Sequence, residues 1–257
     1  MQGSLIQKYG NRYVQQTSFE ISFVIDLHNT HQALNLLEIE RTGGYELATT
    51  NFLIDKLKEG SRFVDVGANY GYFSLVAANL VGHSGQVLAF EPLPSIAQTL
   101  RANAALNGFE NIQVIQAVAC NENGKTPFFV SGLEDGMSSL IPRFGDRKIL
   151  VNAFRLDSVL PRVRFDVVKV DVEGVEESVL LGAQELIGEG YMPSIIVEWN
   201  VGTCARFSDL DKRFAKLGKF GEMYVIEGSA NTTRYRLRGP IKTRKDLPPA
   251  CNVLLRP

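Results

Sequence analysis

The chain has 257 residues, of which 45 % are hydrophobic and 21 % are charged, and its 27 basic side chains nearly balance its 28 acidic ones. This composition is typical of a large globular domain, and the balanced charge provides no general attraction to nucleic acid. Three widely spaced cysteines exclude a zinc knuckle and argue against a disulfide framework, so we expect buried thiols in a reducing compartment: Cys120, Cys204 and Cys251.

Residues 1–44 carry weaker structural signals than the rest of the chain. Residues 19–25 alternate between apolar and polar side chains as a strand does, and residues 31–40 favour a helix. The amino terminus lacks the apolar core of a signal peptide, and no run approaches the ~20 apolar residues of a membrane span, so we expect a cytoplasmic protein. Because two glycines then interrupt the chain, we expect an amino-terminal extension over 1–44 and a main domain over 45–257.

The stretch FVDVGANYGYF, residues 63–73, is the most informative part of the chain. An apolar strand that contains Asp65 leads into a turn with Gly67 and Gly71 and then into an apolar helix, which is how nucleotide-binding sheets begin. Asp65 lies near the end of the strand, where it either orders the turn or receives an ammonium group.

A second acid lies at the distance that such a site requires. Glu91 follows Gly71 by 20 residues and comes directly after the apolar run 86–90, where a carboxylate can bind both hydroxyls of a ribose. We expect Glu91 at an exposed strand tip, so that its loss affects cofactor binding far more than folding. Acids at both strand ends suit S-adenosylmethionine, which has an amino-acid end, a ribose and no phosphate.

The turn departs from the dinucleotide fingerprint G-x-G-x-x-G at two positions. Asn69 stands at the middle glycine and bulky Tyr72 at the last one, so the backbone cannot approach a pyrophosphate closely. No Gly-Lys-Ser/Thr sequence follows, which excludes a Walker-type phosphate loop. The alternative without a ligand is that the glycines only form a tight turn between a strand and a helix.

Strands and helices alternate from residue 62 onward, which predicts a mainly parallel sheet covered on both faces. Such sheets bind ligands at the carboxyl ends of their strands, and Asp65, Glu91, Asp171 and Glu198 all fall at such ends. The predicted elements are helices over 45–58, 70–81, 95–107, 175–187 and 210–217, and strands over 63–66, 86–90, 112–118, 125–130, 165–170, 194–198, 222–226 and 233–237.

The segment KVDVEGVE, residues 169–176, places two carboxylates after a strand end and before a glycine that lets the chain turn into a helix. Asp171 and Glu173 would both reach the edge of the cleft. Glu173 has an alternative role, because an acid at this place can cap the next helix and interact favourably with its dipole.

In these blocks the sequence resembles the FkbM-type S-adenosylmethionine-dependent methyltransferases. The resemblance implies a class I methyltransferase fold, a Rossmann-like, mainly parallel seven-stranded sheet with a reversed last hairpin and helices on both faces. It also implies O-methylation of a hydroxyl, commonly on a sugar or a secondary metabolite, with S-adenosylmethionine as cofactor. The blocks span roughly residues 45–200: VDVGAN at 64–69 with Gly71 and Tyr72, Phe90-Glu91-Pro92, Asn103 and Asn107, LDSVL at 156–160, residues 169–176, LLGA at 180–183, and residues 193–198.

By position, the resemblance places Gly67, Asn69 and Gly71 at the methionine end of the cofactor. It places Glu91 at the ribose and residues 117–121 beside the adenine, with Asn121 where the family usually has an aspartate. The complete set of candidate cofactor-binding residues is Asp65, Gly67, Asn69, Gly71, Tyr72, Glu91, Pro92, Ala119, Asn121 and Asp171.

A hydroxyl acceptor must be held about 3 Å from the activated methyl carbon, with water excluded, and it must lose its proton. Asp171 is our first candidate for the base, and Glu173 and Glu198 are further catalytic candidates. A divalent metal stays open, because carboxylates such as Asp171 and Glu173 can hold Mg²⁺ against vicinal oxygens, but no third ligand can be named.

The three histidines are weaker candidates for catalysis. His83 lies in a helix-to-strand turn on the far side of the sheet, where we expect it to be solvated. His28 and His31 lie in the amino-terminal part of the chain and could cover the cleft.

The carboxyl-terminal part is basic, since residues 212–245 hold ten Lys or Arg and two Glu. A solvated basic face and the attraction of an anionic acceptor both fit this excess, whereas no regular basic and aromatic pattern indicates RNA. The alternatives to a small-molecule or carbohydrate O-methyltransferase are a methyltransferase that acts on nitrogen or on a macromolecule, and a catalytically silent adenosyl-binding module. The intact segment 171–174 argues against the silent module, and the oligomeric state stays open.

Overall fold

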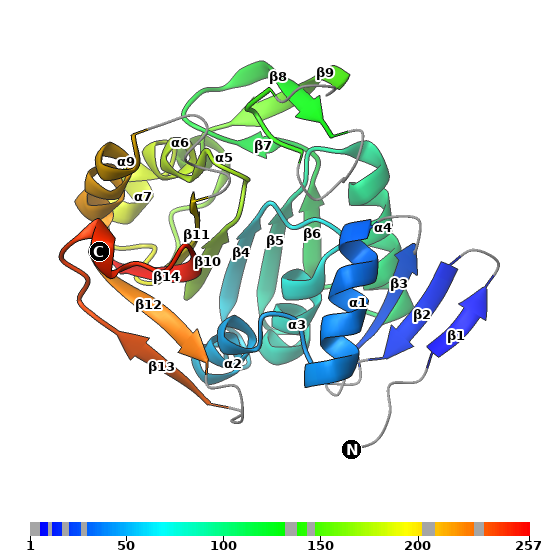
Figure 1. Ribbon diagram of the computed structural model, residues 1–257. Helices are drawn as coiled ribbons and strands as arrows, with labels where there is room; N and C mark the ends of the chain where they lie inside the picture. The colour runs from blue at the N-terminus through cyan, green and yellow to red at the C-terminus, as the bar shows by residue number, and fades with distance from the viewer. Residues whose placement is uncertain are drawn as a thin grey trace.

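The computed structural model describes residues 6–9, 12–16, 21–26, 30–131, 138–142, 147–201, 209–228 and 234–257. At its centre lies an eight-stranded sheet with helices on both faces (Figure 1). The strands lie in the order β13 (Tyr235–Arg238), β12 (Glu222–Gly228), β14 (Ala250–Arg256), β11 (Ile195–Asn200), β10 (Val167–Val170), β4 (Arg62–Val66), β5 (Gln86–Phe90) and β6 (Ile112–Ile115).

The central sheet confirms the expected class I arrangement and adds one strand to it. The five strands from β11 to β6 are parallel, and β14 runs antiparallel between β11 and β12 as the reversed hairpin requires. The expected number of seven is corrected to eight among the described residues, because β13 pairs with the outer edge of β12. An added strand covers an edge that would otherwise expose unpaired backbone groups.

β14 was not predicted, because residues 222–226 and 233–237 were expected to finish the sheet. Its register places Val253, Leu254 and Leu255 between β11 and β12, where all three are buried. A strand buried on both faces shows a short apolar run and no alternation, so its sequence signal is weak.

Each face of the sheet is covered by its own set of helices. Alternate residues of one strand point to opposite faces, so Phe63 packs with one cluster and Val64 with the other. The first face is covered by α2 (Leu47–Lys56), α3 (Tyr72–Val81) and α4 (Pro94–Leu106), and the second by α5 (Leu156–Val159), α6 (Glu176–Leu181), α7 (Gln184–Gly188) and α9 (Leu210–Leu217). Two short 3₁₀ helices, η2 (Gly218–Phe220) and η3 (Arg244–Asp246), lie in the carboxyl-terminal part of the chain.

The single helix predicted over 175–187 is interrupted and forms α6 and α7 instead. Gly182 lies at the break, where an added Cβ would be 2.0 Å from the carbonyl oxygen of Cys120. The chain therefore bends around a close backbone contact that only glycine permits. By contrast, α9 has the bounds that the sequence predicts.

A small second sheet lies beside the carboxyl ends of the central strands (Figure 1). It consists of β7 (Val118–Ala119), β9 (Arg147–Phe154) and β8 (Gly124–Val130). The strand predicted over 112–118 is therefore wrong beyond Ile115, because the chain leaves the central sheet there and β7 pairs with β9. β9 was not predicted, since its outward residues interrupt the apolar pattern.

The amino-terminal residues form a third sheet, β1 (Ile6–Tyr9), β2 (Arg12–Gln16) and β3 (Ser22–Asp26), followed by α1 (Thr30–Thr42). Asn103 of α4 and Asn107, which follows this helix as its C-cap, attach β3 to the main domain: Asn107 Oδ1 accepts from Ser22 N at 2.8 Å, and Asn103 Oδ1 accepts from Val24 N at 2.8 Å. The predicted strand and helix of this part are thus present, although residues 19 and 20 lie outside the described ones. The boundary between residues 44 and 45 stays a prediction.

Two further expectations concern cysteines and membranes. Cys120 is a buried free thiol and Cys251 is a partly buried one, while Cys204 lies outside the described residues. Within the part of the chain that the structure describes, no helix has the length and apolar character needed to cross a bilayer.

Candidate functional site

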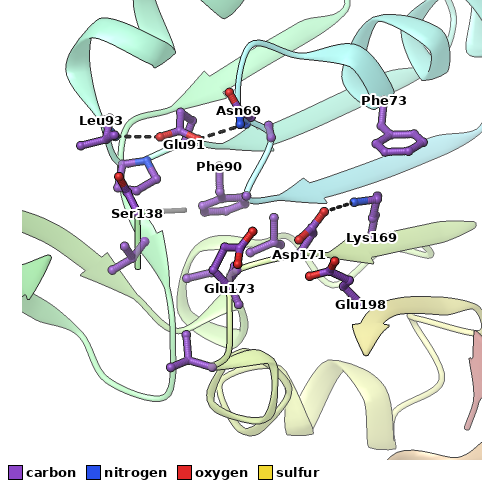
Figure 2. A pocket seen from close by; sticks show the side chains of 18 of the residues that line it. Asn69, Phe73, Phe90, Glu91, Leu93, Ser138, Lys169, Asp171, Glu173 and Glu198 are labelled. Carbon is purple, nitrogen blue, oxygen red and sulfur yellow. Dashed lines mark hydrogen bonds and ion pairs between the residues drawn. The ribbon is translucent and has the colours of Figure 1, made fainter. Parts of the chain in front are cut away.

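A cavity of about 330 Å³ lies at the carboxyl ends of β4, β5, β10 and β11 (Figure 2). This is the edge at which open parallel sheets bind ligands. The turn 67–70, residues 90–93 and residues 117–119 line one part of the cavity. Residues 171–173, Glu198 and several aromatic side chains line the other part.

The turn after β4 is fixed by its backbone. Gly67 has φ 84°, and an added Cβ would lie 1.9 Å from the carbonyl oxygen of Asp171, so no other residue fits. Asn69 has φ 51°, and its Oδ1 accepts a hydrogen bond from Tyr70 N at 2.8 Å. The turn is therefore closed by a side chain at the place where a dinucleotide site has an open glycine.

Glu91 lies against this turn and is held by two backbone amides. Its Oε2 accepts from Asn69 N at 3.0 Å, and its Oε1 accepts from Leu93 N at 2.9 Å (Figure 2). The residue is only 7 % exposed, so the expectation of an exposed strand tip is wrong. Since removal of a buried acceptor leaves amides unsatisfied, Glu91 contributes to folding as well as to the cavity wall.

Seven of the ten candidate cofactor-binding residues line the cavity: Gly67, Asn69, Tyr72, Glu91, Pro92, Ala119 and Asp171. Gly71 does not belong to that lining. It lies directly before α3 with φ 101°, and an added Cβ would lie 2.6 Å from Leu75 Cδ1, so close packing accounts for this glycine.

Asp65 and Asn121 also lie outside the cavity lining. Asp65 is buried and its Oδ2 accepts from Ser74 Oγ at 2.6 Å, so it connects the end of β4 to the first turn of α3, and its two expected roles stay predictions. Burial raises the pKa of Asp65, although nearby Lys169 opposes this effect. Asn121 is exposed, and its Oδ1 accepts from Ser178 Oγ of α6 at 2.8 Å, which turns it away from the cavity.

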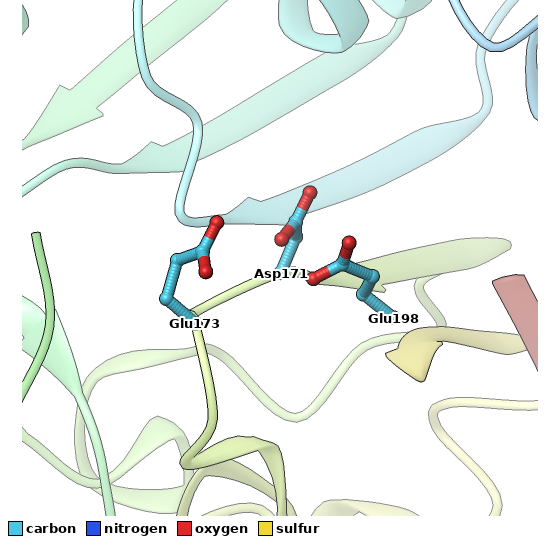
Figure 3. A group of neighbouring side chains, drawn as sticks. All are labelled: Asp171, Glu173 and Glu198. Carbon is cyan, nitrogen blue, oxygen red and sulfur yellow. The ribbon is translucent and has the colours of Figure 1, made fainter. Parts of the chain in front are cut away.

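The three catalytic candidates lie together at the other part of the cavity (Figure 3). Asp171 and Glu173 follow β10, Glu198 belongs to β11, and oxygens of all three carboxylates lie within 4.8 Å of one another. The negative charge of Asp171, with burial and Glu173 as further causes, raises the pKa of Glu198 to about 9. Glu198 also supplies the third carboxylate that the sequence did not group with the other two, so these acids could hold a metal ion.

Lys169 is the principal site residue that sequence analysis missed. Its Nζ lies 2.7 Å from Asp171 Oδ2 and 4.4 Å from the ring centroid of Phe73, and the side chain is 2 % exposed (Figure 2). Burial lowers the pKa of Lys169, but the carboxylates of Asp171, Glu46 and Asp65 outweigh it and raise the pKa, so the ammonium persists. The available signal was a single charged residue inside the otherwise apolar strand β10.

Two other missed residues are Asn35, in α1 of the amino-terminal part, and Tyr45, directly after that part. Asn35 Nδ2 donates to Tyr70 Oη at 3.2 Å, and Tyr45 N donates to Tyr72 Oη at 2.9 Å, and both residues line the cavity. The amino-terminal part thus reaches the cavity through Asn35, while the covering role expected of His28 and His31 stays a prediction. His28 and the side chain of His31 lie outside the described residues, and His83 is exposed in the turn before β5.

Glu176, the first residue of α6, binds the backbone of the loop that precedes this helix, and α6 has no capping hydrogen bond from the side chain of its N-cap residue Val175. Glu176 Oε1 accepts from Gly174 N at 3.0 Å and from Val172 N at 3.3 Å, just before α6. Glu173 instead lines the cavity, with φ 57°. The structure thus assigns the two acids of this segment to different tasks.

At least six of the ten basic side chains in residues 212–245 form ion pairs within the described part of the chain. The pairs are Lys212 with Asp209, Arg213 with Glu176, Lys216 with Glu177, Arg236 and Arg238 with Glu227, and Arg244 with Asp211. Part of the basic charge is thus neutralised within the protein, and both interpretations of the remaining excess stay predictions.

Comparison with known proteins assigns residues 65–224 to the methyltransferase FkbM domain, which is more than half of the chain. A methyltransferase of Sordaria araneosa named sdnD is 29 % identical over 180 residues, 57 % of this chain and 69 % of that protein. Protein-L-isoaspartate O-methyltransferase 2 of Archaeoglobus fulgidus is 39 % identical over 59 residues, 23 % of this chain. The matched part of the chain spans 27 % of the length of that protein-L-isoaspartate O-methyltransferase.

Among solved structures, an S-adenosylmethionine-dependent O-methyltransferase from Thermotoga maritima matches with a TM-score of 0.48 at 15 % identity, covering 97 % of this chain and 94 % of that one. The family match and the strand order together confirm the expected fold class. The cofactor of this domain is S-adenosylmethionine. The closed turn at Asn69 and the acid at Glu91 fit a ligand that has a ribose and no phosphate.

Proposed function

This chain belongs to the FkbM methyltransferase family, and on that premise we propose that it methylates a hydroxyl oxygen of a neutral, polyhydroxylated small molecule such as a sugar. The observation that carries the proposal is the cluster of Asp171, Glu173 and Glu198 on the cavity wall. Carboxylates accept hydrogen bonds from hydroxyls, and they can take the proton that an attacking hydroxyl must lose.

The cofactor supplies a methyl group on a sulfonium, and the acceptor oxygen displaces the sulfur from that methyl carbon. The protein must hold the hydroxyl in line with the methyl and keep water out. We assign the orientation of the hydroxyl to Asp171, whose Oδ2 lies 2.7 Å from the ammonium nitrogen of Lys169. When the oxygen–carbon bond forms and the carbon–sulfur bond breaks, the hydroxyl proton goes to the coupled carboxylates of Asp171 and Glu198.

Glu198 is better suited than Asp171 to retain that proton. The Lys169 ammonium stabilises the charged form of Asp171, whereas the charge of Asp171 destabilises the charged form of Glu198. The two groups interact strongly, so the proton belongs to the pair. We therefore propose a division of labour in which Asp171 orients the hydroxyl and Glu198 carries the proton.

The charge of the cavity favours a neutral acceptor over an anionic one. Among the described residues, the acids Glu91, Asp171, Glu173 and Glu198 line it and Lys169 is the basic residue, so acids outnumber bases there even when Glu198 carries a proton. An anion would meet net repulsion there, while a sugar can place hydroxyls on the acids and a ring face on Tyr45 or Phe73. Oxygen as the acceptor atom is also consistent with the similarity of part of this chain to protein-L-isoaspartate O-methyltransferases.

Two measurements test the proposal. Titration calorimetry should show binding of S-adenosylmethionine and none of NAD. A screen with radiolabelled cofactor should then compare neutral sugars, anionic sugars, phenols and amines, with mass spectrometry of the product to locate the methyl group. Transfer to neutral polyols first is the expected result. Transfer only to amines would refute the oxygen assignment, and absence of any transfer with intact cofactor binding would favour the silent adenosyl-binding module.

A further inference from the structure

The loop between β10 and α6 carries Asp171 and Glu173 in a conformation that it cannot maintain alone. Glu173 has φ 57°, a left-handed conformation that is unfavourable for a residue with a side chain, and Gly174 follows with φ 113°. Such backbone persists only where surrounding groups over-determine it. The hydrogen bonds of this loop therefore show which residues set the direction of the two carboxylates.

Side chains from outside the loop hold its backbone at several points. Glu176 Oε1 accepts from Val172 N and Gly174 N, as described above. Ser139 Oγ, from the segment that pairs with β8, donates to the carbonyl oxygen of Glu173 at 3.0 Å. The amides and the carbonyl groups are thus held from two different sides.

Arg213 of α9 completes this arrangement. Its Nη1 donates to the carbonyl oxygen of Gly174 at 2.6 Å, and its Nη2 contacts Glu176 Oε2. Arg213 is 2 % exposed and Glu176 is 1 % exposed, so the pair is removed from water. One planar guanidinium thereby fixes both the loop carbonyl and the glutamate that holds the loop amides.

A buried ion pair is weak support for stability by itself, because desolvation opposes the attraction of the charges. The geometry of the Arg213–Glu176 pair is informative here. Nη1 of the guanidinium binds the loop carbonyl of Gly174, and Nη2 binds the glutamate that accepts from the loop amides. We infer that Arg213 is a positioning residue for the carboxylates of Asp171 and Glu173, acting through Gly174 and Glu176. The inference rests on the proposed function and adds to it a residue that does not line the cavity.

Two cofactor analogues test the inference without knowledge of the acceptor. S-adenosylhomocysteine lacks the methyl group, and sinefungin carries an amine at the methyl position. Because an ammonium beside Asp171 and Glu173 gains charge-assisted hydrogen bonds, we expect the wild type to prefer sinefungin by about tenfold. The ratio of the two dissociation constants, measured by calorimetry, therefore reports where these carboxylates point.

Arg213→Lys keeps the charge but cannot serve both partners with one fork. We expect it to abolish most of the sinefungin preference, while the affinity for S-adenosylhomocysteine stays within about twofold because its contacts lie at the other part of the cavity. Lys216→Met is the matched control. It removes the exposed pair Lys216–Glu177, which joins the same two helices at 2.9 Å, and should leave both affinities within about twofold.

A second variant tests the same inference if Arg213→Lys does not fold. Arg213→Met combined with Glu176→Gln removes both buried charges and keeps a carbonyl oxygen for the loop amides, and the same loss of preference is expected. Thermal unfolding of each variant checks the folded fraction. An unchanged ratio in a folded variant, or a parallel loss of both affinities, would show a merely structural role and overturn the inference.

The two affinities of the wild-type protein test the proposed function separately from the role of Arg213. Absence of S-adenosylhomocysteine binding would refute the assignment of the cofactor site. Binding without any preference for sinefungin would refute the placement of Asp171 and Glu173 beside the methyl group, and the inference would fall with it. Only a wild-type preference that Arg213→Lys removes supports the positioning role.

Discussion

The two parts of the cavity hold their carboxylates in different ways. In the part lined by residues 67–70 and 90–93, which we propose as the cofactor part, Glu91 is held by two backbone amides. In the part lined by residues 171–173 and Glu198, which we propose as the acceptor part, Asp171 is held by the side chain of Lys169, and Glu198 lies beside two other acids. Backbone amides always donate, so they fix Glu91 as a carboxylate, whereas the charge of Glu198 depends on its neighbours. Changes in the first part should therefore act on affinity, and changes in the second on rate and pH dependence.

The largest effect is expected at Asp171. Asp171→Asn keeps the size of the side chain but removes the charge that orients the hydroxyl and supports proton transfer. We expect a loss of roughly 10²–10⁴ in kcat with the best acceptor of the screen. The affinity for S-adenosylhomocysteine should change little, and calorimetry measures it. A loss of cofactor binding as large as the loss of rate would assign Asp171 to the adenosyl pocket.

Glu91 should show the opposite pattern. Glu91→Ala should weaken S-adenosylhomocysteine binding about tenfold to a hundredfold, because charge-assisted hydrogen bonds are lost. It should also lower the free energy of unfolding by about 1–3 kcal/mol, since two amides lose their buried acceptor. Glu91→Gln keeps one acceptor and serves as the control, with an intermediate affinity. Unchanged affinity in both variants would remove Glu91 from the cofactor site.

Glu198 should make stability and rate depend on pH. Its pKa is about 9 in the folded protein against an ordinary 4.5, so the folded state binds the extra proton between these values. The stability contributed by protonation is complete below pH 4.5 and is lost as the pH rises through about 9. The melting temperature of the cofactor-free wild type should therefore fall relative to Glu198→Gln as the pH rises.

Turnover should change in the opposite direction, because the pair must lose a proton before it can accept one from the hydroxyl. We expect kcat of the wild type to rise toward about pH 9 and this rise to be absent in Glu198→Gln. Parallel melting curves and parallel pH profiles in the two proteins would show that Glu198 is ionised throughout.

The smallest effect is expected from a chelator. The ammonium of Lys169 lies 2.7 Å from Asp171 Oδ2, where it neutralises this carboxylate and repels a divalent cation. Turnover after treatment with EDTA and desalting should therefore stay within about twofold of the untreated enzyme. A loss that Mg²⁺ restores would show that Asp171, Glu173 and Glu198 act as metal ligands.

The cofactor part could be predicted from sequence because its signals are local. Glycines, an asparagine and an acid at fixed spacing along residues 63–91 define a turn and a strand end. Even there, the sequence did not distinguish glycines that face the cavity from Gly71, which is required by packing. It also did not show that Glu91 is buried, because burial depends on residues that fold over the strand end.

The acceptor part could be predicted only in fragments. The sequence placed Asp171 and Glu173 together at the edge of the cleft and named Glu198 as a further candidate, but the proximity of Glu198 to the other two depends on the register between β10 and β11. Lys169 was hidden in an apolar strand, and Tyr45 and Asn35 come from segments whose packing the sequence pattern does not encode. The sequence also did not predict how the last strands pair, because β14 comes from the carboxyl terminus of the chain and lies between β11 and β12.

Gly67 has a consequence for the history of such chains. An added Cβ at this position would lie 1.9 Å from the backbone of Asp171 whether or not a ligand is bound, so the fold itself excludes every larger residue. A descendant that lost methyl transfer would still have to keep this glycine in order to fold. Its persistence among homologues would therefore record selection for a folded sheet, whereas a loss of activity would first become visible as drift at Asp171, Glu173 and Glu198.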